Sequence, residues 1–189
     1  MAAVARWLAP VLLAAAMMLA PPAGAQCRPK NPAGPLPPHE ADLLYLPTPH
    51  HVVAAMLRLA GVSQADVVYD LGSGDGRIPI AAARDFGARG VGLELDSSLI
   101  EAARCNARTA GLEKQVEFRR QDLFRADLGE ATVVTLFLFP DMNRQLAPKL
   151  RAELRPGARI VSHRFGLGDW PPDREIEADG HTLLLWTVQ

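Results

Sequence analysis

A glycine-rich turn that follows a short apolar run is the segment of this sequence best suited to hold a ligand. The turn reads Asp70-Leu71-Gly72-Ser73-Gly74-Asp75-Gly76, with glycine at alternate positions. Glycine lacks a Cβ atom, so the chain can turn tightly and a ligand can approach the backbone closely. A helix that begins directly after the turn would present free N–H groups there. The candidate ligand-binding residues are therefore Gly72, Ser73, Gly74 and Gly76.

The spacing and charge of this turn distinguish two classes of ligand. Dinucleotide sites use the spacing Gly-x-Gly-x-x-Gly, whereas the spacing here is Gly-x-Gly-x-Gly. Asp70 also precedes the first glycine by two residues, where its carboxylate would repel a pyrophosphate. S-adenosylmethionine (SAM) carries an α-ammonium and a sulfonium, and opposite charges attract strongly in a partly desolvated cleft. The turn therefore predicts SAM as the cofactor, with Asp70 among its ligands.

Two further acids stand at the ends of the next two expected strands. Glu94 lies near the end of a strand at 90–95 and can accept hydrogen bonds from both hydroxyls of a ribose. Asp122 follows a strand at 116–120 and can accept one from an adenine amino group, with Leu123 or Phe124 covering the ring. Each acid has an ordinary alternative, a solvated strand end for Glu94 and a helix N-cap for Asp122. Their order along the chain favours one SAM site, because open α/β sheets bind ligands at the carboxyl ends of their strands.

Strands and helices that alternate along the chain must position these residues. The expected strands lie at residues 66–71, 90–95, 116–120, 131–139, 158–163, 174–178 and 182–188, with 131–139 at the centre of the sheet. The expected helices lie at residues 52–60, 78–86, 97–110 and 142–154, with Ser97 as an N-cap and Gly111 as a stop. This alternation predicts an α/β, doubly wound, mostly parallel sheet with helices on both faces. The dipeptide Asp179-Gly180 predicts a C-terminal antiparallel hairpin.

Composition limits the chain to one folded domain. Its 189 residues carry a formal net charge of −1, so no nucleic-acid partner is favoured, although a local basic patch would be an alternative. The two cysteines, Cys27 and Cys105, provide neither a disulfide framework nor a zinc site, and no metal is predicted. We expect Cys105 to be a small buried residue of a helix rather than a nucleophile.

The N-terminal segment differs from the rest of the chain. Residues 1–25 have the layout of a signal peptide, with an apolar stretch at 7–20 and an Ala-x-Ala end, and residues 26–41 form a proline-rich linker. The catalytic domain is expected at residues 42–189. The segment predicts an exported, periplasmic protein; the alternatives are an inner-membrane anchor through residues 7–20 and a cytoplasmic enzyme with a misassigned start codon. Export conflicts with the cytosolic source of SAM.

At these residues the chain resembles the class I, seven-strand, SAM-dependent methyltransferases over about residues 42–189. Within them it is similar to the broad-specificity protein-lysine methyltransferases of archaea and to their mitochondrial relatives, which modify the adenine nucleotide translocase and an ATP synthase subunit. The matching segments are Tyr45 to Pro49, Tyr69 to Ile78, Thr132 to Leu138, Pro148 to Leu150 and Arg159 to His163. The Pro-Thr-Pro and Val-Ser-His segments are more specific than the glycine turn.

The resemblance implies a protein lysine as the substrate. It also implies that Tyr45 and Thr48 close over SAM and that Leu136 and Phe137 border the methyl-transfer channel. The Asn/Asp-Pro-Pro-Tyr/Phe motif that grips a planar amide or adenine amino group is missing, since the chain reads Leu138-Phe139-Pro140-Asp141 at that point. This departure weighs against methylation of glutamine or adenine.

Several aromatic side chains are candidates for the wall of such a channel, because an apolar environment lowers the pKa of a lysine amine. These are Phe137, Phe139 and Trp170. Core packing is the alternative for all three and is favoured for Phe139. His163 is a candidate proton acceptor, with a structural role as its alternative.

Two other functions are consistent with the same sequence. One is a small-molecule methyltransferase on the same fold, and the other is an exported, non-catalytic binding module. Intact Asp70 and Glu94 argue against a decayed site. We expect the protein to be a monomer.

Overall fold

The computed structural model describes Cys27 and residues 46–189. The expected signal peptide or anchor at 1–25, most of the linker at 26–41 and the candidate residue Tyr45 lie outside the described residues. Within the described part, no helix is both long enough and apolar enough to cross a membrane.

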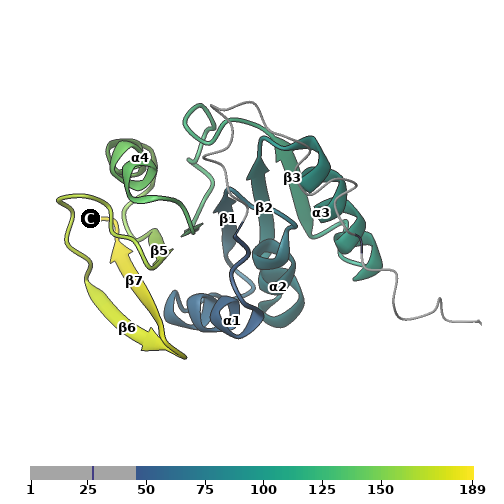
Figure 1. Cartoon of the computed structure of the whole chain (residues 1–189), viewed down its shortest axis with the longest axis horizontal. Coiled ribbons are helices and arrows are strands. Elements are labelled where there is room, and N and C mark those ends of the chain that lie inside the picture. The colour runs from purple at the N-terminus through teal and green to yellow at the C-terminus, as the bar shows by residue number, and fades with distance from the viewer. Residues whose placement is uncertain (1–26, 28–45) are drawn as a thin grey trace, which may run out of the picture.

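A seven-stranded mixed sheet forms the centre of the molecule (Figure 1). Its strands are β1 (Val67–Leu71), β2 (Arg89–Glu94), β3 (Val116–Arg120), β4 (Val133–Leu136), β5 (Arg159–His163), β6 (Arg174–Ala178) and β7 (His181–Thr187). They lie in the order β3-β2-β1-β4-β5-β7-β6. The first five pair in parallel, whereas β7 is antiparallel to both β5 and β6. The predicted seven-stranded, mostly parallel sheet is therefore confirmed.

Helices cover both faces of this sheet, as predicted. They are α1 (His50–Leu59), α2 (Arg77–Phe86), α3 (Ser97–Thr109) and α4 (Pro140–Glu153). Neighbouring residues of one strand enter opposite cores. Val133 packs with residues of α1 and α2, whereas Val134 packs with residues of α4. All four residues of β4 are buried, as expected for a strand that is covered on both faces.

The closing hairpin forms where the sequence predicted it. Asp179 has φ 50° and Gly180 has φ 76°, so both central residues of the turn are in the left-handed region. Such a turn matches the twist of the two flanking strands. It joins β6 to β7, and β7 then completes the sheet beside β5.

The fourth strand is shorter than the predicted 131–139. Its pairing with both neighbours ends at Leu136. The chain order of the strands reverses between β1 and β4, and a crevice opens at such a switch point. Phe137, Leu138 and Phe139 lie beside that crevice instead of continuing the strand. The N-cap of α3 also differs from the predicted Ser97, because the side chain of Asp96 accepts the N–H groups of Ser98 and Leu99.

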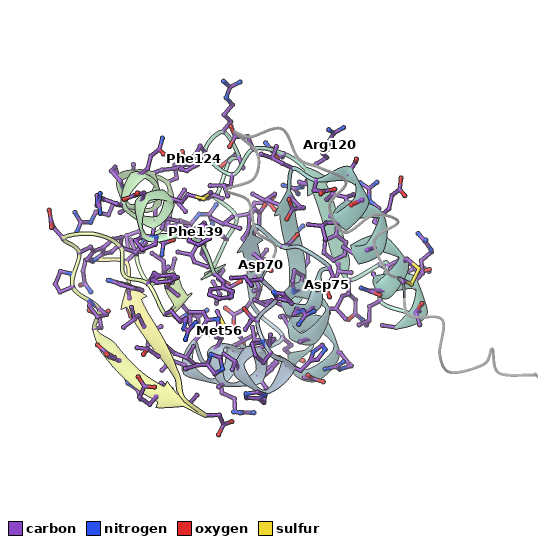
Figure 2. The ribbon with its side chains drawn as sticks, in the orientation of Figure 1. Met56, Asp70, Asp75, Arg120, Phe124 and Phe139 are labelled. Carbon is purple, nitrogen blue, oxygen red and sulfur yellow. A yellow bond between two sulfur atoms is a disulfide. The ribbon has the colours of Figure 1, made fainter. Side chains whose placement is uncertain are left out.

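Cys105 is not the isolated buried residue that we expected. It is partly exposed on α3 and forms a disulfide with Cys27, seen as the yellow bond beside α3 in Figure 2. The two residues are 78 positions apart in the sequence. This covalent bond ties Cys27 to α3.

Candidate functional site

A cavity of about 370 Å³ opens at the carboxyl ends of β1 and β2 and beside the residues that follow β3 and β4. Most of the predicted site residues line it, namely Thr48, Asp70, Gly72, Ser73, Gly74, Glu94, Asp122, Leu123 and Phe137. Segments distant in the sequence therefore meet at one edge of the sheet. Asp70 lies in the interior of the molecule (Figure 2).

Asp70 is a buried acid at the end of β1, with 3% of its surface exposed. Thr135 of β4 donates a hydrogen bond to its Oδ1 atom at 2.7 Å. Burial raises the pKa of the Asp70 carboxyl to about 7, and the charges of Glu94 and Asp75 act in the same direction. The hydrogen bond from Thr135 and the charge of Arg77 oppose this rise. A cation bound beside Asp70 would favour its ionised form.

Glu94 holds the glycine turn as well as facing the cavity. Its Oε2 atom accepts the N–H of Gly74 at 3.0 Å. Its Oε1 atom accepts the N–H groups of Leu95 and Asp96 at 2.7 and 3.0 Å. A carboxylate oxygen can accept about two hydrogen bonds, so Oε2 keeps capacity for one ligand hydroxyl. Glu94 is thus fixed in place before any ligand binds.

The glycine turn leaves one buried hydroxyl without a partner. Gly72 and Ser73 both donate their N–H groups to the carbonyl of Leu93 at 2.9 Å. Ser73 is 4% exposed and lines the cavity, but its Oγ atom makes no hydrogen bond in the structure. Buried polar groups are normally satisfied. A polar ligand in the cavity would supply the missing partner.

Gly76 has a different role from the one its position in the motif suggested. It precedes α2 with φ 80° and is not among the cavity-lining residues. A Cβ atom there would lie 2.4 Å from Cζ of Phe118 and 3.0 Å from Cβ of Ala103. Glycine at this position allows α2, α3 and β3 to pack together.

The segment before α1 forms one side of the cavity. Arg77 donates a hydrogen bond from Nη1 to the carbonyl of Thr48 at 2.8 Å and pairs with Asp75 at 2.6 Å. The side chain of Thr48 lies 3.3 Å from Nδ1 of His163. Arg77 and Thr135 both contribute to the site and were not predicted from the sequence. Both lie in segments that resemble the related methyltransferases, Tyr69 to Ile78 and Thr132 to Leu138, and this was the signal that could have found them.

The predicted channel residues are divided between the cavity and the core. Phe137 lines the cavity and stacks on His163, with ring centroids 4.0 Å apart. His163 is 1% exposed and lies behind Phe137, and Leu136 is fully buried in the core. Trp170 packs on the same core and lies under Arg151, outside the cavity lining.

Phe139 was expected in the core, but 43% of its surface is exposed and it lines the cavity. The expectation failed because the strand ends at Leu136. Leu46 and Leu95 are the other large apolar side chains that are exposed among the described residues, and both also line the cavity. The mouth of the cavity is therefore apolar, and its interior is acidic.

The charges of the lining favour a cationic ligand. The acids are Asp70, Asp75, Glu94 and Asp122, and the one basic residue of the described lining is Arg77, which already pairs with Asp75. Asp122 accepts the N–H of Phe124 at 2.9 Å. The negative lining, the unpartnered Ser73 hydroxyl and the close backbone turn together fit SAM, which carries two cationic groups and a polar nucleoside.

Comparison with known proteins identifies the family. Residues 70–174 match the model of the ANTKMT methyltransferase domain. The chain belongs to this family. This methyltransferase is 44% identical over 149 residues to a protein-lysine N-methyltransferase of Saccharolobus islandicus, covering 76% of the chain and 92% of that relative.

Two further comparisons set the limits of the similarity. The methyltransferase is 45% identical to the adenine nucleotide translocase lysine N-methyltransferase of Mus musculus, over 54% of its own length and 45% of that relative. It also superposes on a crystal structure described as an RNA methyltransferase from Salinibacter ruber, in complex with S-adenosyl-L-homocysteine. That match has a TM-score of 0.75 and 55% identity, and it covers 76% of this chain and 94% of that one. The protein is a SAM-dependent methyltransferase, and SAM is its cofactor.

The unpartnered hydroxyl of this methyltransferase gives a first test. We expect Ser73→Ala to weaken SAM binding by about 1 kcal/mol, the value of one hydrogen bond. The melting temperature of the free protein should not fall, because Oγ makes no bond to lose. Calorimetry and thermal melting measure the two effects, and exposed Ser97, which lies outside the cavity lining, is the matched control. Equal SAM affinity in Ser73→Ala and Ser97→Ala would show that Ser73 makes no hydrogen bond to SAM.

Proposed function

We propose that this enzyme is a protein-lysine N-methyltransferase. The observation that carries the proposal is the 44% identity to an archaeal protein-lysine N-methyltransferase across 92% of that relative's length. The negative interior and apolar mouth of the cavity support it. A lysine ammonium is attracted to the acids, and its methylene chain is accommodated by apolar side chains.

In this proposal, different cavity-lining residues bind different parts of SAM. Asp70 and Ser73 hold the amino-acid end, Glu94 accepts one ribose hydroxyl through Oε2, and Asp122 with Leu123 binds the adenine. Their order follows the order of β1, β2 and β3 in the sheet. Thr48 closes the cavity from the segment before α1, where Arg77 fixes its backbone.

When bound, SAM supplies an electrophilic methyl group on its sulfonium. The residues of this chain have to present a neutral amine in line with that group. Alignment alone supplies a large part of the rate acceleration of such a reaction. Phe137 and Phe139 form an apolar wall, and desolvation beside them lowers the pKa of a lysine amine. No strong general base is therefore required in contact with the amine.

Methylation of RNA is the competing function, because the Salinibacter ruber structure is described as an RNA methyltransferase. The charges of the cavity lining weigh against it. Four acids and one paired arginine would repel a phosphate backbone, which basic proteins bind through lysine and arginine. Both substrates can be tested in one experiment.

The test is tritium labelling of a host lysate with [methyl-³H]SAM and the full chain. We expect label in protein that survives ribonuclease, is lost on protease treatment, and yields methyllysine after acid hydrolysis. Asp70→Asn serves as the SAM-deficient control. Label that is lost with ribonuclease would establish the RNA function instead, and label confined to small molecules would establish a metabolite substrate.

We also propose that the protein is exported. The signal-like pattern of residues 1–25 is one support, and the disulfide between Cys27 and Cys105 is the other. Disulfides persist in oxidising compartments and are rare in the cytosol. Among the alternatives for the N-terminal segment, a misassigned start codon in a cytosolic enzyme fits the disulfide least.

Export can be tested by fractionating the host and treating each fraction with a thiol-reactive maleimide without a reductant. We expect the protein in the periplasmic or membrane fraction, unmodified by the reagent. Cys105→Ser is the control, since it frees the thiol of Cys27. A cytosolic protein that retains Met1 and reacts at both cysteines would overturn the proposal.

We further propose that residues 42–189 act as a monomer. The support is that the described residues of one chain already provide the acids, the glycine turn and the apolar mouth of the cavity. Sedimentation of the full chain at micromolar concentration should give the mass of a single 20.4 kDa chain or of its processed form. A concentration-independent dimer would contradict this.

A further inference from the structure

A row of hydrogen-bonding side chains runs from the cavity to the surface on the side away from Glu94 and Asp122. Thr48, which lines the cavity, has its Oγ1 atom 3.3 Å from Nδ1 of His163. Nε2 of His163 lies 2.9 Å from Nδ1 of His181, at the start of β7. The three side chains come from the segment before α1, from β5 and from β7. They touch because β7 pairs directly with β5.

The outer end of this row is less buried than its inner part. Thr48 is 4% exposed and His163 is 1% exposed, whereas His181 is half-buried and reaches solvent. The ring of His181 contacts that of His51 of α1, with centroids 6.0 Å apart, and the side chain of His51 is 55% exposed. Figure 1 shows the N-terminal part of α1 close to the hairpin of β6 and β7. The row therefore connects the closed interior of the cavity with water.

A neutral imidazole has one N–H donor and one acceptor nitrogen. If the hydroxyl of Thr48 donates to Nδ1 of His163, the proton of that ring is on Nε2. Nε2–H of His163 then donates to Nδ1 of His181, and the proton of His181 is on its Nε2. Every donor in this arrangement points outward, and the lone pairs of the Thr48 oxygen remain available to a group in the cavity.

We propose that Thr48, His163 and His181 form a proton-exit path for the substrate lysine, an inference that rests on the proposed lysine substrate. The ammonium gives a proton to Oγ1 of Thr48, whose own hydroxyl proton moves to Nδ1 of His163. His163 passes its Nε2 proton to Nδ1 of His181, and His181 releases its Nε2 proton to water. One proton leaves the cavity, the lysine becomes a neutral nucleophile, and each side chain ends uncharged. After the product has left, the reverse transfer, from water at His181 to water in the open cavity, restores the starting tautomers.

The charges around His163 support transfer rather than storage of a proton. Burial lowers the pKa of His163 to about 4, and the nearby side chains of His181 and Arg164 act in the same direction. Asp179 faces His51, at 3.9 Å, and not His163. Phe137 covers the other side of the His163 ring. His163 is therefore neutral near pH 7, which is the form that accepts the hydrogen bond from Thr48.

The kinetic test compares His181→Gln with His51→Gln. Glutamine keeps hydrogen-bonding capacity but cannot relay a proton, and His51 contacts the same ring without a hydrogen bond to it. With poly-L-lysine as acceptor, we expect His181→Gln to lower kcat by roughly 10- to 100-fold at pH 7. The loss should shrink towards pH 10, where lysine deprotonates in solution. The KM for SAM should not change, and His51→Gln should match the wild type.

Equal kcat in His181→Gln and wild type across this pH range would overturn the path while leaving the lysine substrate intact. Absence of methyllysine with the wild-type enzyme, on both poly-L-lysine and host protein, would instead overturn the proposed function. Nitrogen-15 NMR of the imidazoles gives an answer that needs no activity. We expect His163 as the neutral Nε2–H tautomer from pH 5.5 to 8, with a shifted Nδ1 signal in Thr48→Val. A protonated His163, or the Nδ1–H tautomer, would contradict the path.

Discussion

Asp70→Asn is expected to weaken SAM binding by roughly 10- to 100-fold, the loss of a charged hydrogen-bonding partner, and to stabilise the free protein at pH 8. Burial raises the pKa of Asp70 to about 7, from an ordinary value of 3.8. Between pH 3.8 and about pH 7, Asp70 keeps its proton in the folded state but has lost it in the unfolded state. The free energy of unfolding therefore falls as the pH rises through that window and stays low above it.

Asparagine carries no charge, so the free energy of unfolding of Asp70→Asn does not fall in this way as the pH rises. We expect the melting temperature of free Asp70→Asn to exceed that of wild type by about 3 to 6 °C at pH 8. At pH 4 the difference should vanish, because wild-type Asp70 is then protonated in the folded state. Asp141→Asn is the matched control, since the side chain of Asp141 is 89% exposed.

The same titration should appear in SAM binding. The cationic ligand favours ionised Asp70, so affinity for SAM should rise between pH 6 and pH 8 and binding near pH 7 should release a proton. Calorimetry in two buffers of different ionisation enthalpy measures that proton. A wild-type affinity that does not depend on pH, together with unchanged affinity in Asp70→Asn, would show that Asp70 does not hold the ligand.

Gly76→Ala is expected to lower the free energy of unfolding by about 3 kcal/mol, which combines overpacking with the left-handed backbone. The new Cβ would lie 2.4 Å from the Phe118 ring, and φ at Gly76 is 80°. Gly111→Ala is the matched control, because φ there is 69° but nothing lies within 4 Å. That variant should lose only about 1 kcal/mol.

Urea denaturation compares the two alanine variants directly. Phe118→Leu removes the ring atoms that the new methyl group meets. The free energy of unfolding of the double variant Gly76→Ala/Phe118→Leu should therefore fall by less than the sum of the two single losses. Equal losses at Gly76 and Gly111 would show that the backbone conformation, and not packing against β3, requires the glycine.

Much of the cavity lining that we assign to SAM could be predicted from the sequence, because its determinants are local. An acid and alternating glycines between a strand and a helix specify the turn at 70–76, whatever the rest of the chain does. Glu94 ends β2 and Asp122 follows β3, and parallel strands bring their carboxyl ends to one edge of the sheet. Asp179 and Gly180 likewise specify the closing hairpin through their own backbone preferences.

The remaining features depend on contacts between residues far apart in the chain, for which no local pattern exists. The pairing of β4 ends at Leu136, and only this exposes Phe139 at the cavity. Thr135 of β4 reaches Asp70 of the neighbouring strand β1, and Cys27 reaches Cys105 across 78 positions. His163 meets His181 only because β7 returns antiparallel beside β5. The local sequence determined the glycine turn. Tertiary packing decided which side chains surround it, since burial and long-range pairing arise only when the sheet is assembled.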